Sequence, residues 1–418
     1  MAISPDTFAR SAGRLVAVVC AAQVLVQIGA FFWPALMPGI MPLWSFSNSE
    51  AGWITASFYG AYMFSVPVLV TLTDRIDPKR IYLFGVASTV AGHLLFGLLA
   101  DGFWSALILR ALTGMGWAGT YMTGLKLLAD RVDAKMMSRA TAGHAASIGI
   151  SGALSFATGD LIATAAGWRA AFFAAAGSTV VAWVLVALIV PAQGRAAVPA
   201  KDGQGLYDFR PVFRNSSAMA YAIAYCIHTL EMSALRGWGV AFLGYVATTT
   251  GAATASFLSP AIVATGLGLI GTFASVAGNE AAIRFGRKRL IVSAMMASIL
   301  IGASIGFVGS LSYAVAAVLL TFYGIVIWLD SSSLTAGTAG TAEPSRRGAT
   351  LAVHSMLGYA GGFVGPLLVG WVLDLSVGMS QLGRGMSFFS VAMLMTLALA
   401  IFWAIRPREL AGDKAKAT

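Results

Sequence analysis

Charged residues are scarce in this sequence. They make up 11% of its 418 residues, 58% of the residues are hydrophobic, and the mean hydropathy is +0.79. An ordinary soluble domain carries about 25% charged residues. So few charges cannot cover the surface of a soluble globule of this length, which excludes a soluble enzyme, a nucleic-acid-binding protein and a disordered chain. A polytopic membrane protein remains. Because a spanning helix needs about 20 apolar residues, the chain has room for about a dozen spans and no large soluble domain.

Cysteines and catalytic signatures are also few. The two cysteines, Cys20 and Cys226, lie in apolar runs without the spacing of a disulfide framework or a metal finger. The sequence has neither a phosphate-cradling Gly-Lys-Ser/Thr loop nor a nucleophile elbow. It therefore predicts no enzyme, no ATP drive, no cofactor and no resident metal. The apolar run from Leu15 to Met41 is too long for a signal-peptide core, which predicts an uncleaved first span.

Long apolar runs predict twelve transmembrane helices. The runs lack the two-residue alternation of a membrane β-barrel, and an even number of helices places both termini on one side. The predicted helices cover residues 14–41, 50–72, 80–100, 103–128, 139–161, 167–190, 216–245, 252–282, 288–308, 311–336, 348–374 and 386–405.

The positions of the basic residues predict the orientation. Of the 27 Lys and Arg residues, 22 fall in segments on the same side as the termini, and only Arg169 and Arg384 fall in the opposite loops. Cytoplasmic segments of membrane proteins carry the excess of Lys and Arg. Both termini are therefore predicted to be cytoplasmic, in a bacterial-type inner (plasma) membrane. The net charge of +10 is then a sign of topology, and no nucleic-acid partner is expected.

An internal repeat divides the chain near its middle. The longest polar stretch runs from Pro191 to about Asn215, and the basic loops that contain Arg75 and Arg284 are 209 residues apart, half the chain length. Parallel repeats of this kind are found in one large class of secondary transporters. The predicted organisation is an N-terminal six-helix half (1–190), a cytoplasmic linker (191–215), a C-terminal six-helix half (216–405) and a cytoplasmic tail (406–418).

Three short signatures carry a family resemblance. The loop after the second span follows the pattern G-x-x-x-D-[RK]-x-G-x-[RK]-[RK]; it keeps Asp74, Arg75, Lys79 and Arg80 but has Val70 and Asp77 at the glycine positions. The second copy keeps Arg284, Gly286, Lys288 and Arg289, with Ile283 in the place of the acid. The fourth span contains LILRALTGMGWAG, which fits R-x-x-x-G-x-G through Arg110, Gly114 and Gly116, and the sixth span opens with GWRAAFF.

With these signatures and the repeat, the whole chain resembles the major facilitator superfamily (MFS) of secondary transporters. The resemblance implies an all-α membrane protein with twelve transmembrane helices in two six-helix repeat halves around a central cavity. It also implies a conformational gate of charged residues, formed here by Asp74, Arg75 and Arg284, which is made and broken as the halves rock.

The resemblance further implies that the first, fourth, seventh and tenth helices line the cavity, and polar residues occur in all four. In the seventh helix, His228, Glu231 and Arg236 fall within an arc of about 140° when each residue advances by 100°. The 209-residue offset maps Arg236 onto Gln27. The predicted substrate-binding residues are Gln23, Gln27, Arg110, Tyr121, His228 and Arg236, and the predicted proton-coupling residues are Glu231 and Asp330.

Two buried guanidinium groups favour a negatively charged solute, because guanidinium recognises carboxylate in a bidentate manner. The sequence thus predicts a secondary active transporter that moves a small organic anion with protons by alternating access. The expected partners are the solute, the proton and the lipid bilayer, and the expected state is a monomer. The absence of a convincing antiporter signature from the fifth helix favours import or symport.

Alternatives remain open at this point. If Glu231 and Asp330 neutralise Arg110 and Arg236, the cavity suits an amphipathic drug or a metal ion. The spacing of His228 and Met232 places a nitrogen and a thioether on one helix face, a possible copper site. A more remote alternative is a membrane sensor that transports nothing.

Overall fold

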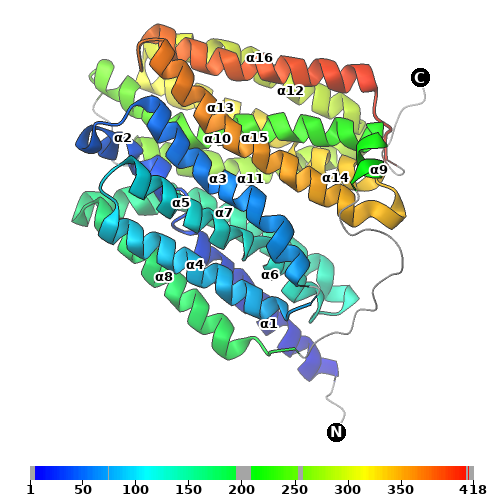
Figure 1. Ribbon diagram of the computed structural model, residues 1–418. Coiled ribbons are helices and arrows are strands. Elements are labelled where there is room, and N and C mark those ends of the chain that lie inside the picture. Colours follow the sequence, from blue (N-terminus) through cyan, green and yellow to red (C-terminus); the bar gives the residue numbers. More distant parts are fainter. Residues whose placement is uncertain (1–4, 74, 194–208, 253–257, 411–412, 414–418) are drawn as a thin grey trace. The chain divides into compact units, whose positions relative to one another are not determined.

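The computed structural model describes residues 5–73, 75–193, 209–252, 258–410 and 413 (Figure 1). Regular structure in these ranges is helical. The first half contains α1 (Pro5–Gln27), α2 (Phe32–Trp44), α3 (Asn48–Leu72), α4 (Pro78–Leu99), α5 (Phe103–Ala118), α6 (Tyr121–Ala129), α7 (Ala134–Ala166) and α8 (Trp168–Ile189). After them come α9 (Arg210–Arg214), α10 (Ser216–Thr249), α11 (Pro260–Phe285), α12 (Arg287–Val308), α13 (Tyr313–Leu329), α14 (Ser331–Thr341), α15 (Arg347–Leu375) and α16 (Gln381–Ile405). Two 3-10 turns, η2 (Gly309–Leu311) and η3 (Pro344–Arg346), precede α13 and α15.

The helices confirm the all-α membrane architecture. Among the described residues, ten segments are helical, long and apolar enough to cross a bilayer. The other two predicted spans differ from these for visible reasons. The fourth span is divided into α5 and α6, of 16 and 9 residues. The seventh, α10, carries His228, Glu231 and Arg236 near its middle.

The chain divides into two compact units. The first unit consists of Met1–Leu36 and Ala61–Ala200. In it, α4 packs against α5 and α8, and α1 packs against α7 and α8. Its apolar core includes Val19, Val86, Leu127 and Val186.

The second unit consists of Met37–Gly60 and Lys201–Thr418. Here α10 packs against α15 and α16, α12 packs against α13 and α16, and α11 packs against α13. The contact between α10 and α15 is close because α15 carries glycines where it crosses its neighbour. A Cβ atom on Gly361 would overlap the Cys226 carbonyl oxygen, and one on Gly365 would overlap that of Leu230. Small residues allow such close approach in membranes.

The helix contacts repeat between the units and so confirm the two-fold internal repeat. In the first unit α1 contacts α7 and α8, and α4 contacts α5 and α8. In the second unit α10 contacts α15 and α16, and α12 contacts α13 and α16. These four helix pairings are therefore common to the two units.

Three predicted spans are interrupted, which corrects their assignment as single helices. The first span breaks between Gln27 and Phe32, the fourth between Ala118 and Tyr121, and the tenth at Asp330. These are three of the four spans that the family resemblance assigns to the cavity lining. Broken helices in membranes occur where other protein groups satisfy the freed backbone atoms.

Several predicted boundaries also shift. The first helix begins at Pro5 rather than 14, and α11 begins at Pro260 rather than 252. The short helix α9 lies inside the predicted linker, of which residues 194–208 are outside the described part. In the predicted tail, the Arg408 backbone N–H donates to Ser217 Oγ at 3.1 Å, so this segment is attached to the second unit.

Candidate functional site

The break in the first span is a prominent polar feature of the first unit. The Arg110 guanidinium donates from Nη2 to the Ala30 carbonyl oxygen at 3.0 Å. The Phe31 backbone N–H donates to Ser155 Oγ at 2.9 Å. A donor and an acceptor released by the break thus find partners on α5 and α7. Arg110 is 2% exposed, and this contact compensates part of the cost of placing a charge at membrane depth.

The other predicted residues of the first unit are amide and phenol groups. Gln23 and Gln27 are buried, and the Tyr82 hydroxyl donates to Gln23 Oε1 at 3.3 Å. Nε2 of each glutamine has no hydrogen-bond partner among the described residues. The Tyr121 ring is half-buried and stacks on His144. The two glutamines therefore keep amide donors available, whereas the Tyr121 ring is fixed by its neighbour.

In the second unit, the break of the tenth span brings an acid next to α10. Asp330 is the N-cap residue of α14. Its Oδ1 lies 3.0 Å from His228 Nδ1, and both side chains are buried. The two atoms are at ion-pair distance but lack the alignment of a hydrogen bond. Tyr225 stacks on His228 and also on His354, with ring centroids 4.0 Å apart in the second case.

Arg236 lies among aromatic rings. Its guanidinium carbon is 4.7 Å from the ring centroid of Trp328. The rings near it also include Tyr59, Tyr225 and Tyr359. A cation over an aromatic face is attracted by the ring quadrupole. Arg236 is half-buried, whereas Arg110 is almost fully buried.

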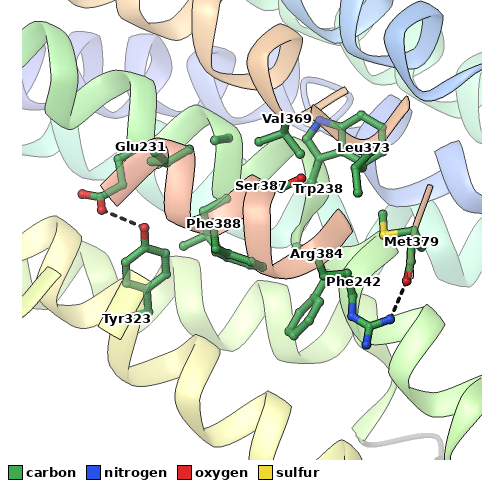
Figure 2. A pocket seen from close by; sticks show the side chains of 14 residues that line it. Glu231, Trp238, Phe242, Tyr323, Val369, Leu373, Met379, Arg384, Ser387 and Phe388 are labelled. Atoms are coloured by element: carbon green, nitrogen blue, oxygen red, sulfur yellow. Dashed lines mark hydrogen bonds between the residues drawn. The ribbon is translucent and has the colours of Figure 1, made fainter. Parts of the chain in front are cut away.

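Glu231 faces the interior of the second unit. It is 1% exposed, and its Oε1 accepts hydrogen bonds from the hydroxyl groups of Ser298 and Tyr323, the latter at 2.7 Å (Figure 2). Its Oε2 has no hydrogen-bond partner among the described residues. Both donors are neutral, and they come from α12 and α13.

The structure therefore separates residues that the sequence placed on one helix face. His228 meets Asp330, while Glu231 contacts Ser298 and Tyr323. Ser298 and Tyr323 were not predicted as site residues, although a serine and a tyrosine within apolar spans indicate hydroxyl groups that need polar partners inside the protein. Met232 packs against the apolar cluster of α10, α11, α12 and α13. No group of three His, Cys, Asp or Glu side chains that could hold a metal occurs in the described ranges.

Of the three predicted gate residues, one lies outside the described residues. That residue is Asp74. Arg75 is exposed. Arg284 pairs with Glu280 one turn earlier on α11, Nη2 to Oε1 at 2.8 Å, and both side chains are more than half exposed. Exposed pairs of this kind stabilise a helix only slightly.

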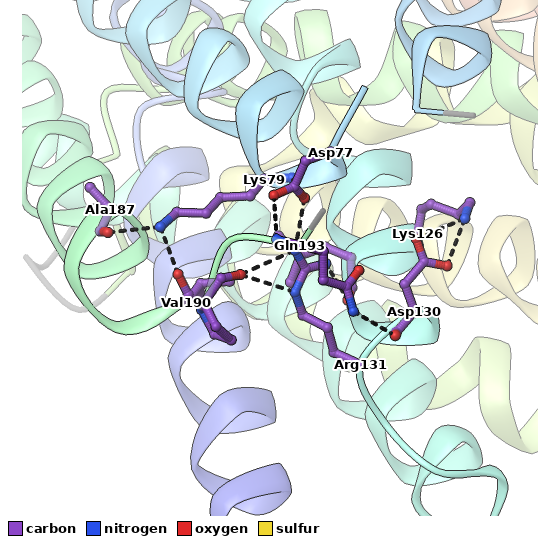
Figure 3. Close-up of polar contacts among 10 residues, drawn as sticks. Asp77, Lys79, Lys126, Asp130, Arg131, Ala187, Val190 and Gln193 are labelled. Carbon is purple, nitrogen blue, oxygen red and sulfur yellow. Dashed lines mark hydrogen bonds and ion pairs between the residues drawn. The ribbon is translucent and has the colours of Figure 1, made fainter. Parts of the chain in front are cut away.

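A buried polar network that the sequence analysis did not predict lies beside the first of these loops (Figure 3). Asp77, which stands at a glycine position of the family pattern, accepts from Arg131 Nη2 at 2.7 Å and from the backbone N–H groups of Lys79 and Gln193. Lys79 Nζ donates to the carbonyl oxygens of Ala187 and Val190. An aspartate directly before Pro78 is an N-cap signature, so the sequence did contain the signal.

These contacts change the acidity of Asp77. Burial raises the pKa of its carboxyl group, but hydrogen bonds from Lys79 and Gln193 and the nearby Arg131 more than offset this and hold the pKa below its usual value. Asp77 is therefore an ionised cap for the N-terminus of α4, where negative charge is favourable.

The corresponding loop of the second half obtains its acid from the segment that follows α16. Arg287 donates from Nε and Nη2 to the two carboxylate oxygens of Asp413, at 2.9 and 3.0 Å. Its Nη1 donates to Asn279 Oδ1 and to the Ser333 carbonyl oxygen. Both charged side chains are 3% exposed. Ser333 belongs to α14, so the tail is connected through Arg287 to the inner part of the tenth span.

Comparison with known proteins identifies the family. The profile of the Major Facilitator Superfamily matches residues 19–366, and the chain belongs to this family. Members of this family are membrane transporters rather than enzymes, and this chain has the family's twelve helices in two six-helix halves.

Several known proteins are similar to this chain in sequence. The human protein spinster homolog 1 is 27% identical over 241 residues, which cover 55% of this chain and 45% of that protein. The chain thus matches about half the length of its spinster relatives. The uncharacterized MFS-type transporter YceJ of Bacillus subtilis is 22% identical over 389 residues, covering 90% of this chain and 93% of that protein.

Solved structures show the same fold. A bacterial homolog of the human lysosomal transporter Spinster, inward-facing and occupied, has a TM-score of 0.78 at 14% identity and covers 94% of this chain and 96% of that chain. The nucleoside transporter NupG has a TM-score of 0.70 at 15% identity, covering 94% and 99%. At these identities the likeness concerns the fold alone.

Proposed function

We propose that this protein is a secondary active transporter that moves a small organic anion together with protons by alternating access. The observation that carries the proposal is the setting of Arg236. A half-buried guanidinium on α10 lies 4.7 Å from the Trp328 ring, with three tyrosines nearby. A guanidinium can bind a carboxylate through two parallel hydrogen bonds, and the rings can pack against the apolar body of a solute.

The choice between the two arginines follows from their contacts. Arg110 is buried and holds the Ala30 carbonyl oxygen in the break of the first span. Moving it toward a solute would leave that backbone oxygen without this donor, at a cost of about 1–3 kcal/mol. Arg236 is more accessible, so we assign it the main contact with the anion and give Arg110 a secondary part.

Glu231 is the proposed proton carrier. It is buried, it receives hydrogen bonds from neutral hydroxyl groups, and its Oε2 has no partner within the described residues. An unpaired carboxylate in a low-dielectric interior is expensive, and protonation removes that cost. Asp330 is the second candidate, and its Oδ1 lies 3.0 Å from His228 Nδ1.

The remaining features of the proposal concern placement and motion. The halves 1–190 and 216–405 rock about the substrate site, with Gln23, Gln27, Tyr121 and His228 also contributing to it, and with Arg75 and Arg284 near the gate. The protein is a monomer in a bacterial-type inner membrane with both termini in the cytoplasm. The excess of basic residues in the corresponding loops supports this orientation.

A second candidate substrate is an amphipathic compound without a net negative charge. The pairing of His228 with Asp330 and the number of aromatic rings around Arg236 favour it. A copper substrate has less support, since His228 Nδ1 already faces Asp330 and Met232 packs in an apolar cluster.

The first experiment is a thermal-shift screen of the purified protein against organic acids, nucleosides, amphipathic cations and copper. A ligand that binds only the folded state raises the melting temperature, and at equal concentration a tighter ligand raises it more. For an anion hit, Arg236→Lys should weaken binding by about tenfold or more, since the planar fork is lost while the charge stays. Its melting temperature without ligand should stay near the wild-type value. Stabilisation by cations alone would contradict the anion assignment.

The second experiment tests coupling in proteoliposomes with a set pH gradient and the solute found in the screen. Glu231→Gln keeps the shape of the side chain and removes its titration. It should abolish uphill accumulation and spare exchange between equal pools. If Glu231→Gln accumulates solute at the wild-type rate, Glu231 is not the carrier, and Asp330→Asn becomes the next variant.

A further inference from the structure

A narrow cavity inside the second unit leads away from Glu231. It lies among α10, α13, α15 and α16, and its volume is about 30 Å³. A water molecule needs roughly 10–15 Å³ of such space, so the cavity has room for about two waters. Figure 2 shows the residues that line it.

The inner end of the cavity is polar. Glu231 and Tyr323 both line it, and they are joined by the hydrogen bond described above (Figure 2). Glu231 also contributes Oε2, the carboxylate oxygen that has no hydrogen-bond partner among the described residues. A buried acceptor beside a cavity that can hold water is the usual setting of an internal water molecule.

The outer end is polar as well. Arg384 lies in the first turn of α16, next to the connection between α15 and α16, and is 5% exposed. It donates from Nη1 to the Met379 carbonyl oxygen, and its guanidinium lies 4.4 Å from the Tyr245 ring centroid. Its Nε has no hydrogen-bond partner among the described residues. Met379 lines the same end (Figure 2).

Apolar side chains separate the two ends. Trp238 and Phe388 lie between Glu231 and Arg384 in the lining, and Phe242 lies next to Arg384 (Figure 2). From Glu231 to Phe242 is eleven residues of helix, or about 16 Å at 1.5 Å per residue. The cavity thus has a hydrogen-bonding group at each end of its lining, and it is too small for an organic solute.

We infer that this cavity is a proton entrance that connects Glu231 with the end of the second unit at the α15–α16 connection. Water enters past Arg384 and hydrates the path for short periods. A hydronium ion transfers one proton to Glu231 Oε2, where an O–H bond forms, and a water molecule remains. The solute needs another route, so proton and solute reach the protein by different paths.

Four charged or titratable groups lie around Glu231 or along the cavity that leads to it. His228 is on the same helix, Tyr323 and Asp330 face it from the tenth span, and Arg384 lies at the far end of the path. From α12 its partner is the neutral Ser298. The inference rests on the proposed role of Glu231 as proton carrier and adds the route by which the proton arrives.

The test compares three glycine variants on α10. Gly239 lines the cavity, and a Cβ atom there would lie 3.6 Å from Leu235 and from Leu320, an ordinary contact. Gly239→Ala should therefore leave the path open, and Gly239→Leu should fill it. Gly244 does not line the cavity, and a Cβ atom there would have no neighbour within 4 Å. Gly244→Leu is thus the matched control for adding a leucine to the same helix.

The readout is the infrared carbonyl band of protonated Glu231 in the purified full-length protein, identified by its loss in Glu231→Gln. After transfer to acidic deuterated buffer, the band shifts as deuterium replaces the proton. Gly239→Leu should slow this exchange at least about tenfold, a barrier increase of about 1.4 kcal/mol. Gly239→Ala and Gly244→Leu should exchange at the wild-type rate. Thermal melting of each variant checks that it is folded.

Equal exchange rates in Gly239→Leu and wild type would overturn the inference, as would equal slowing in Gly244→Leu. The result is separable from the test of the proposed function. Slow exchange in Gly239→Leu together with wild-type accumulation in Glu231→Gln would mean that the path reaches Glu231 but that another residue carries the transported proton.

Discussion

The first and seventh spans occupy equivalent positions in the two halves, yet only one of them is broken. The first span consists of α1 and α2 with an interruption after Gln27, whereas α10 runs from Ser216 to Thr249 without one. In the first half, Arg110 is used to hold the Ala30 carbonyl oxygen of the break. In the second half, where α10 needs no such support, Arg236 faces aromatic rings. The same side-chain type thus supports a helix break in one half and lies against aromatic rings in the other.

The largest expected effect comes from replacing each of these two arginines with methionine, a neutral residue of similar length. Arg110→Met removes the donor to Ala30 and should lower the free energy of unfolding by about 2–3 kcal/mol, the cost of a buried acceptor left without its partner. Arg236→Met should change it by less than about 1 kcal/mol and should abolish anion binding instead. Denaturation of both variants in the same detergent measures the difference. Equal destabilisation would remove the distinction between the two arginines.

A smaller effect is expected from a pair of serines, one of which supports the break in the first span while the other lies in the continuous seventh span. Ser155→Ala leaves the Phe31 N–H without its acceptor and should cost about 1–2 kcal/mol. Ser233 on α10 donates only to the Leu230 carbonyl oxygen within its own helix, so Ser233→Ala should cost less than about 0.5 kcal/mol. Thermal unfolding of the pair compares the broken span with the continuous one. A reversed order would show that the break is not held by Ser155.

The smallest effect concerns Asp77, the acid of the loop before α4, and it depends on pH. The pKa of Asp77 is lower in the folded protein than in the unfolded chain, so the unfolded chain binds more protons in acid. The stabilisation by Asp77 is therefore complete above the ordinary pKa of aspartate, about 3.9, and is lost as the pH falls through the lower folded value. Asp77→Asn keeps an N-cap side chain but removes the charge that pairs with Arg131 and favours the N-terminus of α4, so it should cost about 0.5–1 kcal/mol at neutral pH.

The same variant should flatten the acid limb of the stability curve. Melting temperatures measured between pH 7 and pH 3 give this comparison directly. An Asp77→Asn curve parallel to that of the wild type throughout this range would contradict the role given to the carboxylate.

Much of the fold could be predicted from the sequence because lipid imposes strong conditions. The lengths of the apolar runs predicted the spans, and the 209-residue separation of the two basic loops predicted the repeat. The breaks were not predictable in the same way. The segment from Gln27 to Phe32 is mostly apolar and contains no proline, and its interruption depends on partners that lie far away in the sequence, Arg110 and Ser155.

The candidate site was predicted in composition but not in arrangement. Helical periodicity placed His228, Glu231 and Arg236 within one arc of α10. A buried helix has several neighbours within such an arc, and the contacts of each neighbour decide where a side chain goes. Glu231 meets Tyr323 of α13, whereas His228 meets Asp330 because the tenth span breaks at that residue. Periodicity along a single helix contains no information about a break in another.

The link between Arg287 and Asp413 has a consequence for biosynthesis. The two residues are 126 positions apart, so a ribosome that adds about 5–20 residues per second makes the acid roughly 6–25 s after the arginine. Until then the guanidinium lacks the carboxylate that it holds in the finished protein. In the first half, Asp77 meets Arg131 after only 54 further residues. The first half can therefore complete its loop early, whereas the second half must wait until Asp413 has been synthesised.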